Sequence, residues 1–360
     1  MEEGDIPHTP EDPAVLDKYQ KAGEACSAAM TEVLQAVAPG VKVHELCRFG
    51  DESMLKHVTR ALKRVKCEKG IAIPTTVCRN NIASGYSPSS SDDSLEVGDI
   101  VKIDLGVHID GYVAQACNTI VVGIGDEPLE GLGADLYCSL FYGCEAALRL
   151  LRPGRTNRDV TKVLTSIAET FGVTCISEVK GYEMKQWVHD GINTIDMGSS
   201  DEISDQFEFK PWQVYSIDLM ITNGSGKLHK SPVKPSIFTR DVQITKKPRM
   251  DAARHALGEI DKKFPVFPFH KNWLTTKNAA FGVSECEKLD CIIPTPILHE
   301  TPGKLVARMK FTALITGSNT LRLTPGYTPV INPSKEITDP EILAILKMNT
   351  RRSKKKKGKK

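Results

Sequence analysis

The sequence predicts an α+β fold made of two related halves. Two apolar helical segments, one from Ala25 and one from Tyr137, each run into a Pro-Gly pair, and the breaks at Pro39-Gly40 and Pro153-Gly154 lie 114 residues apart. In both copies we expect a second helix a few residues later, from Val43 or Asn157. β-like sequence then follows at 71–77 in one copy and 173–177 in the other. A duplicated architecture of this kind can hold a site between its halves.

A β-hairpin is expected between Gly98 and Gly123. Segments 101–105 and 113–122 are rich in Val and Ile, and Asp110-Gly111 between them is a typical turn pair. With those two residues at the centre of the turn, Asp104 lies opposite Cys117, and Gln115 is its diagonal neighbour on the same face. Two carboxylates at these places would hold a divalent ion, whereas Asp with a neutral amide makes a poor half-site. A satisfied buried acid is the competing interpretation of Asp104.

Later elements follow from the same patterns. Strands are expected at 213–222 and 305–316, where the sequence is alternating or continuously apolar with β-branched residues. The charged stretch between them, about 240–301, is interpreted as an insertion with a helix at 250–264. A short apolar helix is expected at 339–348, with Thr338 or Asp339 as its cap.

Composition limits the class of protein. The 360 residues can bury a large core, and the ten cysteines are scattered without zinc-finger spacing, which favours reduced thiols. We expect neither secretion nor membrane insertion, because the acidic N-terminus lacks an apolar segment and no later run approaches roughly 20 apolar residues. The last ten residues carry eight of the positive side chains, so with a total of +2 the rest of the chain sums to −6. Such a tail binds polyanions or serves in nuclear import, with a merely solubilising tail as the alternative.

Four motifs give the chain a family resemblance. They are IAIPTTVCRNNIASGYSP from Ile71, VGDIVKIDLGVHIDG from Val97, VYSIDLMITNGSGK from Val214 and MKFTALI from Met309. With the insertion, they make the chain similar to type 2 methionine aminopeptidases, and in particular to their proliferation-associated, ErbB-receptor-binding non-peptidase branch. The resemblance implies the duplicated pita-bread (creatinase/aminopeptidase) fold with a type 2 helical insertion. The implied domain is 12–349, with halves of about 12–125 and 126–349, preceded by a flexible acidic arm, 1–11, and followed by a disordered basic tail, 350–360.

The resemblance also implies where a dinuclear metal site would stand. Its five ligand positions correspond to Asp104, Gln115, Tyr182, Asp218 and Lys310, and the position of its substrate histidine to Gly85. Only two of the five keep a carboxylate, so we expect no dinuclear metal centre, no catalytic residue and no cofactor. We expect Lys310 to form an ion pair with Asp104 and Asp218 in the pocket; the alternative is that it extends to the surface. His108, His189 and His229 are interpreted as structural or surface histidines.

The expected function is that of an inactive homologue that binds RNA. The relatives implied by the resemblance bind the large ribosomal subunit near its exit tunnel, with roles in ribosome biogenesis, translation or growth regulation. A basic stripe is expected on one face of the second helix, at Lys56, Arg60, Lys63 and Arg64. The candidate RNA-binding residues are Lys56, Arg60, Lys63, Arg64, Lys246, Lys247, Arg249, Arg351, Arg352, Lys354, Lys355, Lys356, Lys357, Lys359 and Lys360.

Two other classes of function stay open at this stage. One is a residual aminopeptidase with a single metal on Asp104 and Asp218. The other is a peptide- or histone-binding chromatin module, in which the two aspartates capture an amine unless Lys310 already occupies them. The expected partners are the large ribosomal subunit and rRNA, with other RNA or nuclear proteins as further candidates and no membrane. We expect a monomer located in the cytoplasm and the nucleus or nucleolus.

Overall fold

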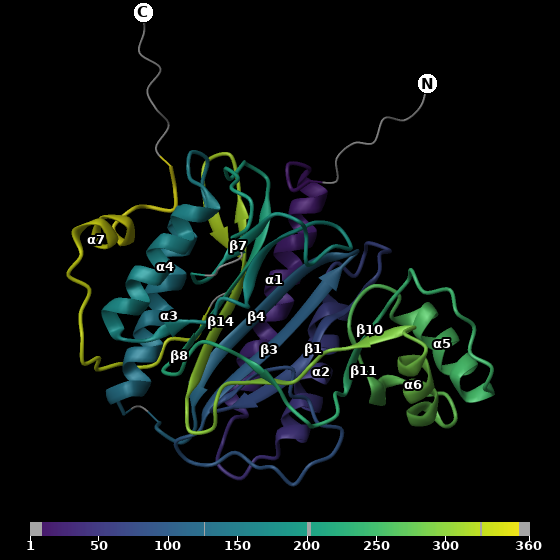
Figure 1. Cartoon of the computed structure of the whole chain (residues 1–360). Coiled ribbons are helices and arrows are strands. Elements are labelled where there is room, and N and C mark those ends of the chain that lie inside the picture. The colour runs from purple at the N-terminus through teal and green to yellow at the C-terminus, as the bar shows by residue number, and fades with distance from the viewer. Residues whose placement is uncertain (1–8, 126, 200–202, 325, 353–360) are drawn as a thin grey trace, which may run out of the picture.

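The computed structural model describes residues 9–125, 127–199, 203–324 and 326–352. Within these residues the first half consists of two helices followed by four strands, coloured purple to blue in Figure 1. These elements are α1 (Pro13–Gln35), α2 (Val43–Arg60), β1 (Lys69–Arg79), β2 (Ile82–Ser84), β3 (Ile100–Ile109) and β4 (Tyr112–Val121). The second helix begins at Val43, as the sequence predicts. Asp12 caps α1 by accepting a hydrogen bond from the backbone N–H of Ala14.

The second half repeats the helix pair. It contains α3 (Gly131–Leu150), α4 (Asn157–Phe171), β5 (Thr174–Cys175), β6 (Lys180–Met184), β7 (Thr194–Asp196), β8 (Val214–Thr222), β14 (Val306–Ile315) and β15 (Thr320–Arg322). A reciprocal capping box between Thr156 and Asp159 starts α4. The expected start at Asn157 and the two expected long strands are therefore confirmed, with ends that differ by one residue.

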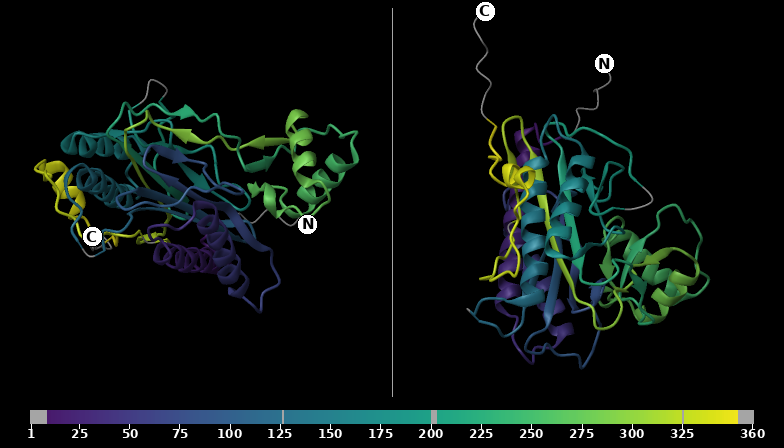
Figure 2. Two further views of the ribbon diagram at one scale, coloured as in Figure 1. Left: turned by 90° about the horizontal axis from the view of Figure 1, so that it is seen from below. Right: turned by 60° about the vertical axis from the view of Figure 1, so that its left-hand side comes forward.

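Most of the remaining elements lie between β8 and β14. They are β9 (His229–Lys230), β10 (Ile237–Arg240), α5 (Asp251–Lys263), β11 (Phe269–His270), the 3-10 helix η1 (Lys271–Trp273), α6 (Ala279–Lys288), β12 (Ile292–Pro294) and β13 (Leu298–His299). We call residues 240–301 the inserted segment. Its helices α5 and α6 pack around a small core of their own, including Leu257, Phe269 and Cys286. Figures 1 and 2 show them projecting to one side of the molecule, beside β1 and α2.

One sheet joins the two halves. In the described part of the chain it has nine strands in the order β1-β3-β4-β14-β8-β6-β7, with β15 beside β14 and β5 beside β8. Strands β4 and β14 form the seam between the halves. Alternate residues such as Ile103 and Leu105 of the first half pack on α1 and α2, and residues such as Phe311 and Leu219 of the second half pack on α3 and α4. Since side chains alternate along a strand, the residues between them point to the opposite face.

Residues near the C-terminus differ in part from expectation. The short helix α7 (Pro340–Leu346) is capped by Asp339, one of the two predicted caps. The first residues of the predicted tail, 350–352, make backbone hydrogen bonds: the N–H of Arg352 donates to the carbonyl of Ser318, and the carbonyl of Thr350 accepts from Thr320. Residues 353–360, and residues 1–8 of the predicted N-terminal arm, lie outside the described part of the chain. Among the described residues, no helix combines the length and apolar character needed to cross a membrane.

Candidate functional site

The hairpin sets the position of Asp104. Both turn residues have positive φ, 53° at Asp110 and 78° at Gly111, which is the backbone that a two-residue hairpin with the native strand twist requires. Strand β3 therefore pairs with β4 so that Asp104 lies opposite Cys117. The predicted register is confirmed. Asp104 points to the face of the sheet opposite the four helices.

The same cross-strand row continues through the second half. Cys117 of β4 is paired with Lys310 of β14, and Lys310 is paired with Asp218 of β8. Four neighbouring strands thus present Asp104, Cys117, Lys310 and Asp218 in one line across the seam. Because directly opposite residues have Cβ atoms only about 5 Å apart, these side chains share one site.

Lys310 makes the ion pair that the sequence predicts. Its Nζ lies 2.7 Å from Oδ2 and 3.0 Å from Oδ1 of Asp104, and 3.5 Å from Oδ2 of Asp218. The side chain of Lys310 is only 7% exposed, which excludes the alternative that it extends to the surface. The amine occupies the space between the two carboxylates.

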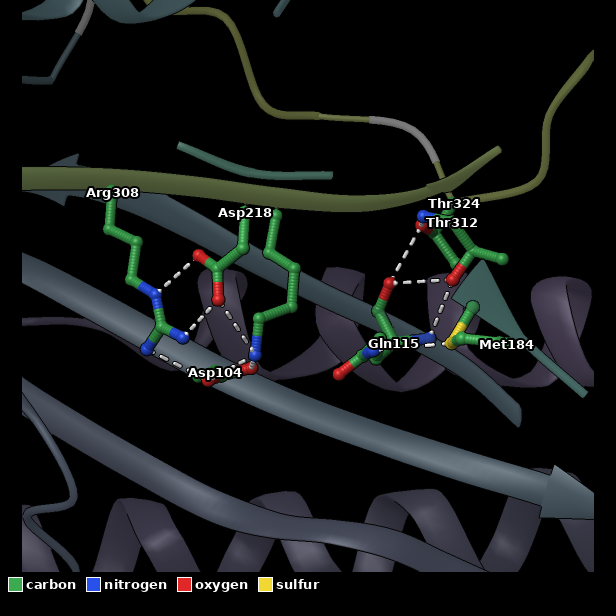
Figure 3. Close-up of polar contacts among 8 residues, drawn as sticks. Asp104, Gln115, Met184, Asp218, Arg308, Thr312 and Thr324 are labelled. Carbon is green, nitrogen blue, oxygen red and sulfur yellow. Dashed lines mark hydrogen bonds and ion pairs between the residues drawn. The ribbon is translucent and has the colours of Figure 1, made fainter. Parts of the chain in front are cut away.

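Arg308 is a fourth member of this site that sequence reasoning missed. Its Nε and Nη2 lie 2.7 and 2.5 Å from the two carboxylate oxygens of Asp218, and its Nη1 lies 2.9 Å from Oδ2 of Asp104 (Figure 3). The sequence signal was available, because Arg308 is two residues before Lys310 on a strand and so shares its face. We call Asp104, Asp218, Arg308 and Lys310 the charge cluster.

The charge cluster balances its own charge. Two carboxylates face one guanidinium and one amine, and all four side chains are at most 10% exposed. Burial by itself would raise the pKa of Asp218, but Arg308 and Lys310 hold it below its ordinary value. Asp218 therefore stays ionised at neutral pH, and both carboxylates are paired with cations of the protein itself.

Gln115 lies apart from the charge cluster, as Figure 3 shows. Its backbone N–H donates to Oγ1 of Thr312, and its carbonyl accepts from Thr312 and Thr324. Its side-chain amide lies 3.3 Å from Sδ of Met184. The register makes Gln115 the diagonal neighbour of Asp104, as the sequence predicts, but its amide is engaged with Met184 rather than with the charge cluster.

Two further positions differ from what a metallopeptidase site needs. Tyr182 lies on β6 opposite Ser216, next to the charge cluster, and burial raises the pKa of its phenol, so it is neutral at physiological pH. At Gly85, φ is +80° and a Cβ would lie 2.4 Å from the carbonyl oxygen of Pro296. A histidine at Gly85 would require the 296–297 backbone to move.

These donors do not fit a divalent metal centre. Among the described residues, no group of three or more His, Cys, Asp or Glu side chains is arranged to hold a metal ion. The two remaining carboxylates are saturated by Arg308 and Lys310, and a dication placed between them would meet two positive charges at short range. His108 and His189 are mostly buried and His229 is exposed, in keeping with structural and surface roles.

The basic residues proposed for RNA are arranged differently from the prediction. Helix α2 ends at Arg60, so Lys63 and Arg64 do not continue its face: Ala61 is extended and Leu62 has φ of 46°. Lys63 and Arg64 are exposed in the turn that follows. Lys56 is paired with Glu32 at 2.6 Å. The stripe is therefore a cluster at the end of α2 rather than one helical face.

Some of the other candidate residues are exposed, whereas others make ion pairs or hydrogen bonds within the protein. Lys246 is paired with Asp290 at 3.1 Å, whereas Lys247 and Arg249 are exposed. Arg351 is exposed, but the guanidinium of Arg352 donates to the turn between β14 and β15. The remaining candidates lie outside the described residues: Lys354, Lys355, Lys356, Lys357, Lys359 and Lys360.

The chain resembles known proteins in sequence and in fold. Residues 17–246 match metallopeptidase family M24. The chain is 37% identical to ErbB-3 binding protein 1 of Solanum tuberosum over 354 residues, which cover 97% of this chain and 91% of the relative. It is 31% identical to the curved DNA-binding protein of Schizosaccharomyces pombe over 361 residues, covering 96% of this chain and 93% of the relative. Among solved structures, a thermophilic Arx1 superposes with a TM-score of 0.86 at 24% identity, covering 94% of this chain and 99% of that one.

Proposed function

We propose that this chain, which belongs to metallopeptidase family M24 and has its pita-bread fold, is a catalytically inactive aminopeptidase homologue. The reason is that two cations, Arg308 and Lys310, fill the place of a metal. Its proposed role is to bind RNA and the ribosome, at the large subunit near the exit tunnel. This role would act in ribosome biogenesis, translation or growth regulation, in the cytoplasm and the nucleus or nucleolus. The protein is proposed to work as a monomer.

The charge cluster is the observation that carries the first part of the proposal. A metallopeptidase needs a cation that polarises the substrate and activates water. Here the amine of Lys310, 2.7 Å from Asp104, takes the place of that cation and has no open coordination position. It offers neither Lewis-acid chemistry nor a bound hydroxide. A residual peptidase with one metal on Asp104 and Asp218 is disfavoured for the same reason.

The peptide-binding alternative meets the same obstacle. A module that captures a peptide N-terminus needs a free carboxylate for the incoming ammonium group. Both Asp104 and Asp218 already accept charge-assisted hydrogen bonds from Arg308 or Lys310. We therefore do not place peptide capture at the charge cluster.

The binding part of the proposal is supported by exposed cations and by the name of one relative. Arg60, Lys63 and Arg64 stand together at the end of α2, and Lys247 and Arg249 lie in the inserted segment. Exposed lysine and arginine side chains suit phosphate groups, and such contacts position a protein without reading bases. The related curved DNA-binding protein is named for binding a nucleic acid. Contacts of this kind predict affinity that falls steeply with salt.

Two measurements test the two parts separately. Purified protein is assayed with cobalt or manganese on Met-initiated peptides, and turnover abolished by chelator would overturn the claim of inactivity. Co-sedimentation with ribosomes is then measured across a salt series for the full chain, for a chain without Arg351 to Lys360, and for the triple variant Arg60→Gln, Lys63→Gln and Arg64→Gln. A matched triple variant, Arg158→Gln, Lys162→Gln and Lys304→Gln, removes three exposed cations elsewhere.

The expected result is salt-sensitive binding that weakens on removal of the tail or the α2 cluster. Each lost phosphate contact should make the slope of log K against log[salt] shallower by about 0.7 to 0.9. The matched triple variant should keep the slope of the full chain. Binding that is independent of salt, or equally weakened by both triple variants, would contradict the proposed sites.

A further inference from the structure

A cleft lies between α2 and the inserted segment, away from the charge cluster. Its volume is about 400 Å³, within the range of cavities that hold small ligands. One wall is the stripe of α2 that carries His44, Asp51 and Leu55, the opposite wall is Trp273 with His270, and Ser87 to Ser89 close the end. Polar groups of two elements that are distant in the sequence thus meet around one hollow.

Asp51 is the acid of this cleft. It is 9% exposed, and its two carboxylate oxygens accept hydrogen bonds from the backbone N–H of Thr75 at 2.9 Å and from Nε1 of Trp273 at 3.2 Å. These donors are neutral, and no cation of the described residues lies within ion-pair distance of Asp51. Burial raises the pKa of Asp51 to about 7. The carboxyl group therefore lacks the positive partner that a buried acid ordinarily has.

Other polar atoms in the cleft lack partners within the described part of the chain. Nδ1 of His44 and Oγ of Ser89 are buried and make no hydrogen bond. Such atoms are uncommon in native proteins, because an unmade buried hydrogen bond costs about 1 to 3 kcal/mol. Both residues line the same hollow as Asp51, so one ligand could satisfy all three.

The charges around the cleft favour a cation. Arg48 and Glu52 stand at its mouth, 3.8 Å apart and each about 70% exposed, so they largely cancel. Burial lowers the pKa of His270, which is therefore neutral at pH 7. What remains is the carboxyl of Asp51 beside the indole ring of Trp273. A carboxylate and an aromatic face are the two groups that recognise an ammonium ion.

We propose that this cleft binds the protonated amine of a small organic molecule, with Asp51 as its counter-ion, His44 and Ser89 as hydrogen-bonding partners, and Trp273 and Leu55 around its apolar part. The site is independent of the proposed RNA-binding role. It uses none of the residues of the charge cluster.

The indole N–H signals of the full-length protein provide the test. The sequence has three tryptophans, and Trp273 is identified by its loss in Trp273→Phe. n-Butylamine, n-butanol and butyrate, which share a chain length and differ in charge, are titrated at pH 7.5. The ammonium form should shift the Trp273 signal saturably, with Trp187 and Trp212 unmoved. Its dissociation constant should be at least about tenfold lower than that of butanol, the difference expected for one charge-assisted contact.

Two variants test whether Asp51 and Leu55 take part in amine binding. Asp51→Asn keeps the shape and should weaken butylamine binding at least about tenfold, with unchanged Trp187 and Trp212 signals as evidence of folding. Leu55→Lys places an ammonium group at the mouth from a side chain that is already 44% exposed, and should abolish binding without affecting the fold; Leu132→Lys, at 42% exposure outside the cleft, is its control. Equal binding of butylamine and butanol, unchanged binding in Asp51→Asn or Leu55→Lys, or no saturable shift with butylamine would overturn the proposal.

Discussion

Arg308 binds Asp218 through two parallel hydrogen bonds of 2.7 and 2.5 Å while its third nitrogen reaches Asp104, 2.9 Å away on the other half of the molecule. The charge cluster therefore joins the two halves across the seam between β4 and β14. A metal bound by residues from both halves would hold them together in the same way. In this structure the cations of the protein itself make that link.

Replacing Lys310 with Met should destabilise the protein. The substitution leaves two buried carboxylates with one guanidinium, and removing one partner of a buried ion pair costs about 3 to 5 kcal/mol. We expect a loss of that size in the free energy of unfolding, measured with urea at pH 7. Lys304→Met, at an exposed position near the start of the same strand, should change it by less than about 0.5 kcal/mol. Equal effects of the two substitutions would show that the cluster adds nothing to stability.

A carboxylate at position 310 should create metal affinity. In the double variant Arg308→Gln, Lys310→Glu, three acids would surround the space that the two cations now fill, which suits a divalent ion. Calorimetric titration with Mn²⁺ should show saturable binding to the variant and at least about tenfold weaker binding to the natural chain. Lys310→Glu alone, which keeps Arg308, should fall between them. Metal binding by the natural chain as tight as by the double variant would contradict our account of the site.

The seam itself depends on threonine hydroxyl groups. Oγ1 of Thr312 accepts from the backbone N–H of Gln115 at 2.9 Å and donates to its carbonyl at 3.2 Å, and the side chain is fully buried. Thr312→Val keeps the shape but leaves that N–H without its partner. We expect a loss of about 1 to 3 kcal/mol in the free energy of unfolding. Thr328→Val, at an exposed position, should be neutral; a neutral Thr312→Val would mean that water replaces the hydroxyl.

Some contacts of the site could be predicted from the sequence and others could not. The partner of Asp104 was predictable because a two-residue turn fixes hairpin register. The face that Arg308 shares with Lys310 was predictable, but its contact with Asp218, 90 residues earlier in the chain, follows from the pairing of β14 with β8 and was not. Lys63 and Arg64 were misplaced because helical spacing was extended beyond the end of α2. The hydrogen bond from Trp273 to Asp51 joins residues 222 positions apart in the chain. Local sequence patterns cannot predict a contact of that separation.

Asp51 should make the protein less stable as pH rises. Its pKa is about 7 in the folded chain and near 4 when unfolded. The folded state therefore holds the proton more tightly, so the contribution of Asp51 is fully present below pH 4 and is lost as pH rises through 7. Asp51→Asn should remove this slope, so that its free energy of unfolding relative to the natural chain rises between pH 4.5 and 8 in urea titrations. A difference that stays constant with pH would contradict the raised pKa.

Lys102 should have the opposite effect to Asp51 on the free energy of unfolding, which should increase as pH rises. Its side chain is 1% exposed, its amine donates to the carbonyl of Asn80 at 2.6 Å, and burial lowers its pKa from 10.5 to about 7. Below pH 7 the folded state bears the full cost of the buried charge, on the order of 5 kcal/mol at about 1.4 kcal/mol per pKa unit. Between pH 7 and 10.5 the unfolded chain binds more protons than the folded one, so stability rises with pH.

Lys102→Met removes this cost but also the hydrogen bond to Asn80, which is worth about 1 to 3 kcal/mol for a charged donor. We therefore expect Met to stabilise the protein at pH 6.5, with an advantage that shrinks by about 3 kcal/mol at pH 9.5. Urea unfolding of both proteins at the two pH values measures the difference, in which groups common to both cancel. An advantage of equal size at both pH values would mean that Lys102 titrates normally, and that packing rather than charge explains the gain.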